Sequence, residues 1–164
     1  MSGQEKYVCD ADSLIKLYRH LERACVKGLR QLAKSEALYI PEGVARELRR
    51  RTSGLSRFIE RYEDFIVVRL KDNPRLRAEV ARMEGVYGES ITVWKQRYSG
   101  FWASQAGRKA ADSQVVAVAK VFGRTAVSDD NVVKLACALE NVPCIGWTEF
   151  ARRLGLVKQL SLFQ

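Results

Sequence analysis

Six acidic side chains at the ends of apolar segments are the residues of this sequence best suited to chemistry. They are Asp10, Asp12, Glu47, Asp112, Asp129 and Asp130. Carboxylates crowded within about 4–6 Å of one another repel, and burial penalises their charges further. A divalent cation removes that conflict, because Mg²⁺ and Mn²⁺ are hard ions that bind oxygen ligands. If these acids meet in the folded chain, the sequence therefore predicts a Mg²⁺ or Mn²⁺ site.

Short apolar runs that alternate with helical patterns are the elements that would position these acids. Apolar runs predict strands at residues 6–9, 38–40, 65–68, 125–127 and 143–146. Apolar side chains at helical spacing predict helices from residue 13, from residue 41, and over 55–62, 76–87, 91–98, 110–121 and 132–139. A closing helix capped by Thr148 follows, and residues 99–107 predict a loop. The alternation predicts an α/β fold, a three-layer α/β/α, Rossmann-like domain with a central, mainly parallel sheet.

Four of the acids follow predicted strands, where a parallel sheet binds its ligands, and Glu47 and Asp112 lie near the starts of predicted helices. The carboxyl ends of parallel strands meet at one edge, and ligands bind there at the point where the strand order reverses. A purely structural interpretation also exists for each acid. Asp10 and Asp130 are suited to N-cap helices, and Glu47 is suited to pair with Arg50 or Arg51 on a solvated helix face. The joint occurrence of four acids at these positions is less probable by chance than that of any one of them, which favours the shared site.

Composition limits the classes of function. The chain has 164 residues, which predicts a single domain over residues 1–164, and its net charge of +9 favours a polyanionic partner. Four cysteines without paired spacing and a single histidine, His20, argue against a zinc site or a histidine-based triad. No apolar run approaches the roughly 18 residues that span a bilayer, and no signal-peptide pattern opens the chain. We therefore expect a cytoplasmic protein with reduced thiols and no membrane partner.

Two basic stretches are candidates for nucleic-acid contact. Residues 46–61 hold six Arg against two Glu, and four cations near residues 95–109 flank four aromatic side chains, which is suited to phosphate contact with base stacking. The candidate contacts are Arg46, Arg49, Arg50 and Lys109. The alternatives are a solvated helix face for the arginines and core packing or a homodimer contact for the aromatics. Trp94 and Tyr98, at i and i+4, have the spacing of a core-facing helix pair.

The ordered acidic motifs resemble those of PIN-domain nucleases, the family of VapC-type toxins and stand-alone PIN proteins. Residues 8–15 (VCDADSLI) are similar to the strand, Asp-Thr-Asn and apolar helix that open the family's fold. Residues 38–48 are similar to its strand, helix start and Glu-Leu pair, and residues 111–119 to its Asp at the start of an apolar helix. Residues 127–130 (VSDD) are similar to its strand closed by Thr-x-Asp. The four motifs occur in family order from residue 7 to about residue 145.

The resemblance implies a PIN-like fold and assigns roles to individual residues. Asp10, Glu47, Asp112 and Asp130 match the acidic quartet that holds the metal, with Asp10 and Asp112 as direct ligands. Ser128 matches the hydroxyl of Thr-x-Asp. The chain departs from the family at Asp12, where Asn is usual, and at Asp129, which leaves open whether Asp129 or Asp130 faces the metal.

The activity implied by the resemblance is Mg²⁺- or Mn²⁺-dependent hydrolysis of RNA. Such an endoribonuclease is expected as a homodimer, and as the toxin of a toxin–antitoxin pair it would have a small antitoxin protein as partner. One alternative is a haloacid-dehalogenase-like phosphatase, with Asp10 as nucleophile, Asp12 as acid and Lys109 as the neutralising lysine, but it leaves Glu47 and Asp112 unexplained. The other is an inactive RNA-binding PIN module. The choice of RNA, the acceptance of DNA and the number of metals stay open.

Overall fold

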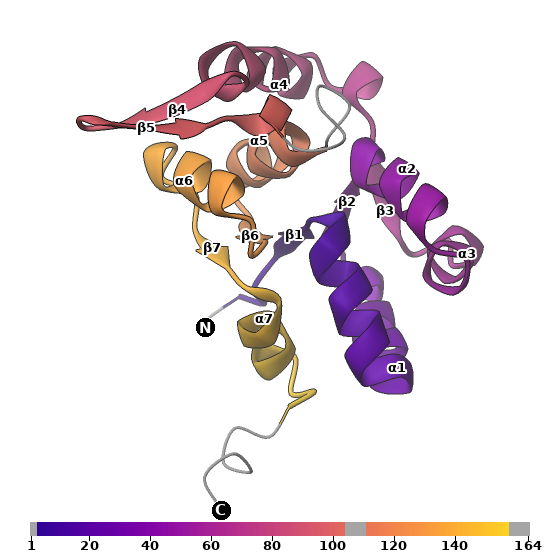
Figure 1. Ribbon diagram of the computed structural model, residues 1–164. Helices are drawn as coiled ribbons and strands as arrows, with labels where there is room; N and C mark the ends of the chain where they lie inside the picture. Colours follow the sequence, from indigo (N-terminus) through magenta and orange to yellow (C-terminus); the bar gives the residue numbers. More distant parts are fainter. Residues whose placement is uncertain (1–2, 104–110, 158–164) are drawn as a thin grey trace, which may run out of the picture.

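Five parallel strands form the centre of the computed structural model, which describes residues 3–103 and 111–157. In spatial order they are β3 (Ile66–Val68), β2 (Leu38–Pro41), β1 (Tyr7–Cys9), β6 (Thr125–Val127) and β7 (Cys144–Ile145). All four pairings are parallel, so the predicted strands and the predicted parallel sheet are confirmed. The order along the sheet reverses between β1 and β6, which are direct neighbours (Figure 1).

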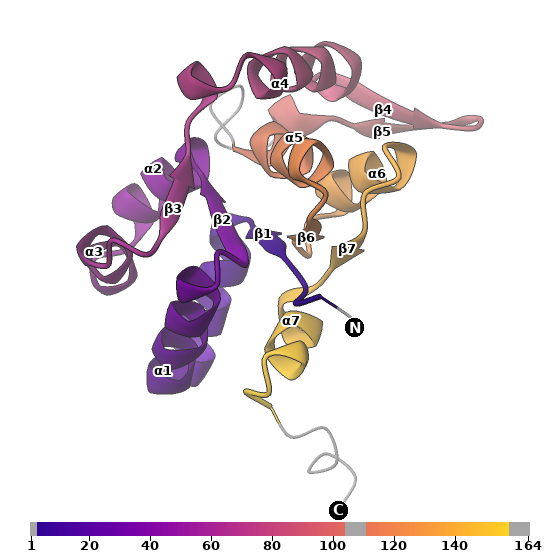
Figure 2. The ribbon, with the colours of Figure 1, turned by 180° about the vertical axis from the view of Figure 1, so that it is seen from behind.

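Helices cover both faces of this sheet and complete a three-layer α/β/α, Rossmann-like fold. They are α1 (Ala11–Lys34), α2 (Glu42–Arg51), α3 (Gly54–Arg61), α4 (Pro74–Tyr87), α5 (Asp112–Phe122), α6 (Asn131–Leu139) and α7 (Trp147–Arg153). Helices α1 and α7 lie on one side of the sheet, and α5 lies on the other with α4 and α6 packed around it (Figures 1 and 2). Short 3-10 turns occur at Leu70–Asp72 and Phe101–Ala103. Across the described residues, no helix combines the length and the apolar character needed to cross a bilayer.

The helices on both faces of the sheet explain why the strands appear as apolar runs in the sequence. All three residues of β1 are buried, because a sheet covered on both faces has no solvent side. Residues 115–119 of α5 are buried without interruption, which an amphipathic surface helix would not allow. Helix α5 is enclosed because it lies between the sheet and α4. The central helix thereby holds its first residue, Asp112, at a fixed place above the strands.

The helix predicted over residues 91–98 is wrong. The segment forms an antiparallel hairpin of β4 (Ser90–Val93) and β5 (Gln96–Ser99), joined by the two-residue turn Trp94–Lys95. Burial alternates along this segment as it does in a strand, because Ile91 is buried while its neighbour Thr92 is exposed. Its β-branched residues also favour a strand. The i, i+4 spacing of Trp94 and Tyr98 is a coincidence of the turn, so the core-packing interpretation of this pair is wrong as well.

Two predicted helix starts are also shifted. Gly146, not Thr148, is the N-cap of α7, and the carboxylate of Asp129 accepts the backbone N–H of Trp147 at 3.1 Å instead. Helix α5 begins at Asp112, two residues after the predicted start. Most of the loop predicted over 99–107 lies outside the described residues, although Phe101–Ala103 form a 3-10 turn.

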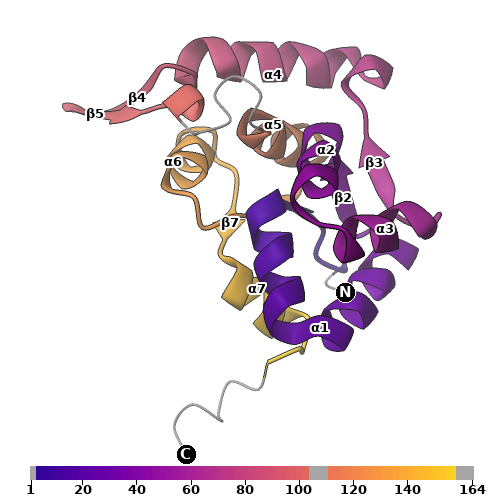
Figure 3. The same ribbon diagram turned by 45° about the vertical axis from the view of Figure 1, so that its right-hand side comes forward.

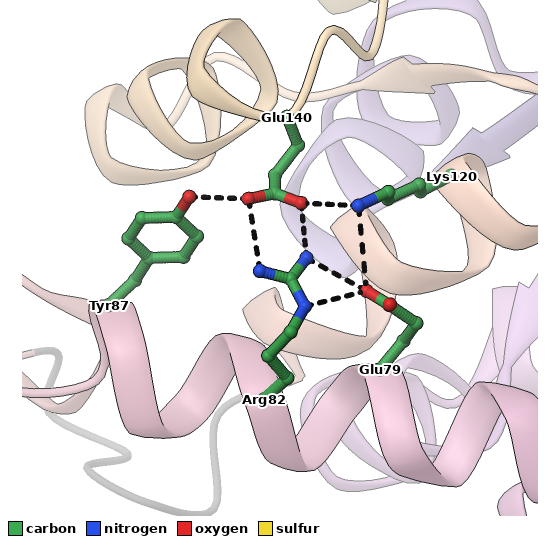
Figure 4. A network of polar contacts seen from close by, with 5 residues as sticks. All are labelled: Glu79, Arg82, Tyr87, Lys120 and Glu140. Carbon is green, nitrogen blue, oxygen red and sulfur yellow. Dashed lines mark hydrogen bonds and ion pairs between the residues drawn. The ribbon is translucent and has the colours of Figure 1, made fainter.

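A network of charges attaches α4 to the rest of the domain (Figure 4). Glu140, which ends α6, accepts hydrogen bonds from Arg82 and Tyr87 of α4 and from Lys120 of α5 at 2.7 Å. Glu79 pairs with Arg82 at 2.9 Å and with Lys120 at 3.8 Å. The side chain of Glu140 is only 7% exposed. Burial alone would raise the pKa of Glu140, but the bonds from Arg82, Lys120 and Tyr87 outweigh it and lower the pKa to about 2.

Candidate functional site

The strand-order reversal between β1 and β6 is where an open α/β sheet binds its ligands. Asp10 directly follows β1, and Ser128 directly follows β6. The Ser128 hydroxyl donates a hydrogen bond to Oδ2 of Asp10 and accepts one from the backbone N–H of Asp130 at 3.1 Å. A fully buried hydroxyl therefore connects the ends of two neighbouring strands at the reversal.

Asp10 is both a helix cap and the base of this site. Its Oδ1 accepts the backbone N–H of Ser13 at 2.8 Å, so the N-cap interpretation is confirmed. Burial raises the pKa of Asp10, whereas the hydrogen bonds from Ser128 and Ser13 oppose that rise. The side chain is nearly inaccessible, at 6% exposure, and both of its oxygens accept hydrogen bonds. Its position is thus fixed before any ligand binds.

A close approach between α2 and α5 brings Glu47 and Asp112 to the same place. The backbone N–H of Gly43 donates to Oε1 of Gln114 at 2.9 Å, across 71 residues of sequence. A Cβ atom at Gly43 would lie 2.9 Å from the Cβ of Ala111, so only glycine allows this contact. Sequence reasoning missed this pair, because a glycine in a first helical turn and a glutamine on a helix carry no signal of a tertiary contact.

Asp112 is the acid whose pKa is raised by burial and by the other three acids. Its carboxylate is half-buried and, among the described residues, accepts no hydrogen bond. Burial and the negative charges of Asp130, Asp10 and Glu47 raise the pKa of Asp112 to about 7. The four predicted acids, called the acidic quartet below, therefore share one electrostatic neighbourhood although they come from four separate segments.

The two neighbouring acids after β6 face different ways. Asp130 accepts the backbone N–H of Val132 at 2.8 Å and that of Val133 at 3.2 Å, which makes it the N-cap of α6, and its charge acts on Asp112. Asp129 is turned toward α7, where it binds the N–H of Trp147. Asp130 rather than Asp129 therefore belongs to the quartet.

Arg51 provides a positive charge at the rim. Its guanidinium donates to Oε1 of Glu47 at 3.2 Å and to Oδ1 of Asp12 at 3.3 Å, so the predicted pairing of Glu47 with a nearby arginine is confirmed. Lys16 also pairs with Asp12, at 3.0 Å. Burial would raise the pKa of Asp12, but Lys16 and Arg51 outweigh it and lower the pKa. Asp12 is therefore already neutralised by cations of its own chain.

Two of the four predicted nucleic-acid contacts line a hollow beside α3 and β3. Arg46 and Arg49 line a hollow of about 460 Å³ on the side of α2 that faces α3 and β3. Arg49 donates to Glu60 there at 2.8 Å. Arg50 is exposed on α2, and Lys109 lies outside the described residues.

The donors of the quartet fit a hard divalent cation, since all four are carboxylates and Mg²⁺ and Mn²⁺ prefer oxygen. Within residues 3–103 and 111–157, no three acidic, histidine or cysteine side chains already stand close enough together to enclose a metal ion. Asp112 is the member whose carboxylate accepts no hydrogen bond from the described residues, and burial and the other three acids raise its pKa. A cation beside Asp112 would take its carboxylate as a ligand and would offset the repulsion from the other three acids.

Replacing Ser128 with alanine is expected to weaken this site without unfolding it. The change removes the hydrogen bond that opposes protonation of Asp10 and leaves the N–H of Asp130 unpaired, so we expect a loss of about 1–2 kcal/mol in unfolding free energy. The pKa of the Asp10 carboxyl, followed by NMR, should rise. Ser128→Thr keeps the hydroxyl and should restore the wild-type pKa. An unchanged pKa in the alanine variant would contradict the role given to Ser128.

Comparisons with known proteins agree with this fold. A family model described as a domain of unknown function, DUF4411, matches residues 7–157. No curated protein matches the chain. Among solved structures, the crystal structure of PAE2754 from Pyrobaculum aerophilum is similar over 93% of this chain and 97% of that chain, with a TM-score of 0.50 and 17% sequence identity. At that identity the similarity concerns the fold alone.

Proposed function

Because the chain belongs to the DUF4411 family, a domain of unknown function, we propose a function from the site itself: a metal-dependent endoribonuclease that hydrolyses phosphodiester bonds of RNA. One observation carries the proposal. Asp10 follows β1 at the strand-order reversal, and Asp112, which accepts no hydrogen bond among the described residues, lies within electrostatic reach of Asp10, Glu47 and Asp130. Such a cluster opposes folding unless it binds a cation. The net charge of +9 on a molecule with an acidic site supports a polyanionic substrate.

The resemblance to PIN-domain nucleases gives each member of the quartet a role in this proposal. Asp10 and Asp112 would hold the cation directly, and Glu47 and Asp130 would hold it or its bound water. When bound, Mg²⁺ or Mn²⁺ supplies an activated water and neutralises charge on the phosphate. Ser128 keeps Asp10 in place, and Arg51 restrains Glu47.

The phosphatase alternative is not supported by the contacts of Asp10. A nucleophilic carboxylate needs a free oxygen that substrate can reach, whereas both oxygens of Asp10 accept hydrogen bonds and the side chain is 6% exposed. Asp12, its general acid, is held by Lys16 and Arg51 in the charged form. The phosphatase also leaves Glu47 and Asp112 without a role, although both act electrostatically at the same place as Asp10.

Cleavage of a labelled single-stranded RNA by the purified protein tests the proposal. We expect cleavage with Mg²⁺ or Mn²⁺, none in EDTA, and a rate at least about 100-fold lower in Asp10→Asn, because losing a ligand removes the cation that activates water. The matched control is Asp12→Asn, an identical change two residues away at an acid that Lys16 and Arg51 already neutralise. It should stay within about threefold of the wild type.

Three outcomes of that experiment are informative beyond the rate. A DNA strand of the same sequence shows whether the ribose is required. RNA binding without cleavage under both metals would overturn the nuclease and leave the inactive RNA-binding module. Equal loss in Asp10→Asn and Asp12→Asn would contradict the roles of the quartet. The homodimer and the small antitoxin protein stay predictions, which growth arrest on expression and its relief by a neighbouring gene would support.

A further inference from the structure

The β4–β5 hairpin projects from the body of the protein as a two-stranded ribbon (Figures 1 and 3). Its strands pair only with each other, from Ser90 opposite Ser99 to Val93 opposite Gln96. The base is anchored, because Ile91 is buried and β4 contacts α6. All four residues of β5 are exposed. Val93 packs against the core from β4, but the exposed residues of the turn and of β5 contribute little to the core and need another explanation.

The tip of the ribbon carries a large hydrophobic residue that is not buried in the fold. Trp94 is 87% exposed, the most exposed large hydrophobic side chain in the described part of the chain. Its backbone has a φ of 56°, a conformation that large side chains rarely adopt. Two-residue hairpin turns favour glycine or asparagine at such a position. Neither burial nor turn geometry explains a tryptophan here, which leaves contact with a partner.

Positive charge surrounds this tryptophan. The Nζ atom of Lys95 lies 5.1 Å from the centre of the Trp94 ring, and Arg97 is exposed on the adjoining strand. Residues 90–99 contain no acid, and within the described residues neither cation forms an ion pair. Tyr98 adds a second ring, 39% exposed. The tip thus combines an exposed aromatic ring with two cations that form no ion pair within the described residues.

We propose that the β4–β5 ribbon is an arm that binds single-stranded nucleic acid, with a base stacked on Trp94 and phosphates beside Lys95 and Arg97. The inference deepens the proposed function, on which it rests for the choice of RNA as the strand. Aromatic rings interleaved with cations are the usual means of holding unpaired strands, because every base has a stacking face and every linkage has a charge. Trp94, Tyr98 and Arg97 are types that protein interfaces also favour, but lysine is depleted there and the net charge of +9 favours a polyanionic strand.

Binding of a fluorescent single-stranded RNA of about 20 nucleotides, measured by anisotropy in EDTA, tests the arm without cleavage. Trp94→Ala should weaken binding about tenfold, and Trp94→Phe should recover most of that loss because a ring remains. Val86→Ala, an equally apolar and 55% exposed position on α4, should bind as the wild type does. Lys95→Gln and Arg97→Gln should each reduce the salt dependence of binding by about one charge.

The result separates the arm from the catalytic site. Wild-type RNA affinity in Trp94→Ala would overturn the arm, whether or not the protein cleaves RNA. Tryptophan-dependent binding by a protein that cleaves nothing would support the arm and contradict the nuclease instead. A change of oligomeric state in Trp94→Ala, with unchanged RNA affinity, would show that the tip contacts a second copy and would also overturn the proposal. Because Trp94 is exposed, all these variants are expected to fold.

Discussion

Asp112→Asn is expected to abolish RNA cleavage and, in EDTA at about pH 8, to make the protein more stable than the wild type. At pH 8 the wild-type Asp112 carboxylate is ionised, although it is half-buried beside three other acids. Its pKa is about 7 in the folded protein, so folding favours the protonated form over the ionised form. The rise of its pKa from 3.8 to about 7 corresponds to at most about 4 kcal/mol of unfolding free energy. An uncharged amide of the same size removes that cost and also removes a metal ligand.

The pH dependence of this gain follows from the direction of the shift. The folded state binds the proton of Asp112 more tightly than the unfolded state, so the wild type is stabilised below about pH 4 and loses that stability as the pH rises to about 7. The advantage of Asp112→Asn should therefore be absent near pH 4 and complete above pH 7. Urea unfolding at a series of pH values measures it, with the exposed Asp64→Asn as the matched control.

Divalent cations should reverse the order of stability. Adding Mg²⁺ or Mn²⁺ is expected to raise the midpoint of unfolding of the wild type and to leave that of Asp112→Asn nearly unchanged, because binding to the folded state alone adds to stability. A variant that is less stable than the wild type at pH 8 in EDTA would show that Asp112 is satisfied by contacts and not repelled by the quartet. A gain of the same size at pH 4 and pH 8 would also contradict the argument.

The strands and the acids that follow them were predictable because both depend on local sequence. The runs that became β1, β2 and β6 are apolar on every residue or nearly so, and each ends at a polar or helix-starting position. A parallel sheet then places those ends together. The fold class of the protein follows from the alternation of strands and helices along the chain. Whether Asp129 or Asp130 joins the quartet was not predictable, because it depends on which backbone N–H each carboxylate reaches.

The hairpin and the approach of α2 to α5 were beyond sequence reasoning for physical reasons. Residues 91–98 contain so few apolar positions that periods of 2 and of 3.6 residues both fit, and the rings of Trp94 and Tyr98 favour the wrong one. Gly43 and Gln114 meet across 71 residues, and a single chain records no such pairing. Both failures occur where a residue is selected for a contact rather than for its own helix or strand.

Glu140→Ala should cause the second large effect, away from the site. The 7% exposed carboxylate receives hydrogen bonds from Arg82, Lys120 and Tyr87 (Figure 4), and removing it leaves two cations and a hydroxyl without their shared acceptor. Breaking one partner of a buried pair costs about 3–5 kcal/mol. Because Arg82 and Lys120 are about 40% exposed, we expect about 2–3 kcal/mol. Glu63→Ala, an exposed glutamate on the α3–β3 connection, should change stability by less than about 0.5 kcal/mol.

The pH dependence of this effect runs opposite to that of Asp112. Folding lowers the pKa of Glu140 from 4.5 to about 2, so its stabilisation is present above about pH 4.5 and is lost as the pH falls toward 2. The difference between wild type and Glu140→Ala should therefore shrink in acid. A difference that stays constant from pH 7 to pH 2.5 would assign the loss to packing rather than to charge.

Loss of Glu140 should also show whether the ribbon depends on α4. Helix α4 leads directly into β4, and Arg82 and Tyr87 of that helix are the groups that Glu140 holds. We expect faster amide hydrogen exchange in α4 of Glu140→Ala, and weaker RNA binding in EDTA because Trp94 is no longer held at a fixed place. Cleavage of a dinucleotide, which has no further nucleotides to bind the ribbon, should change little. If binding and dinucleotide cleavage fall together, the network supports the whole fold and not the arm in particular.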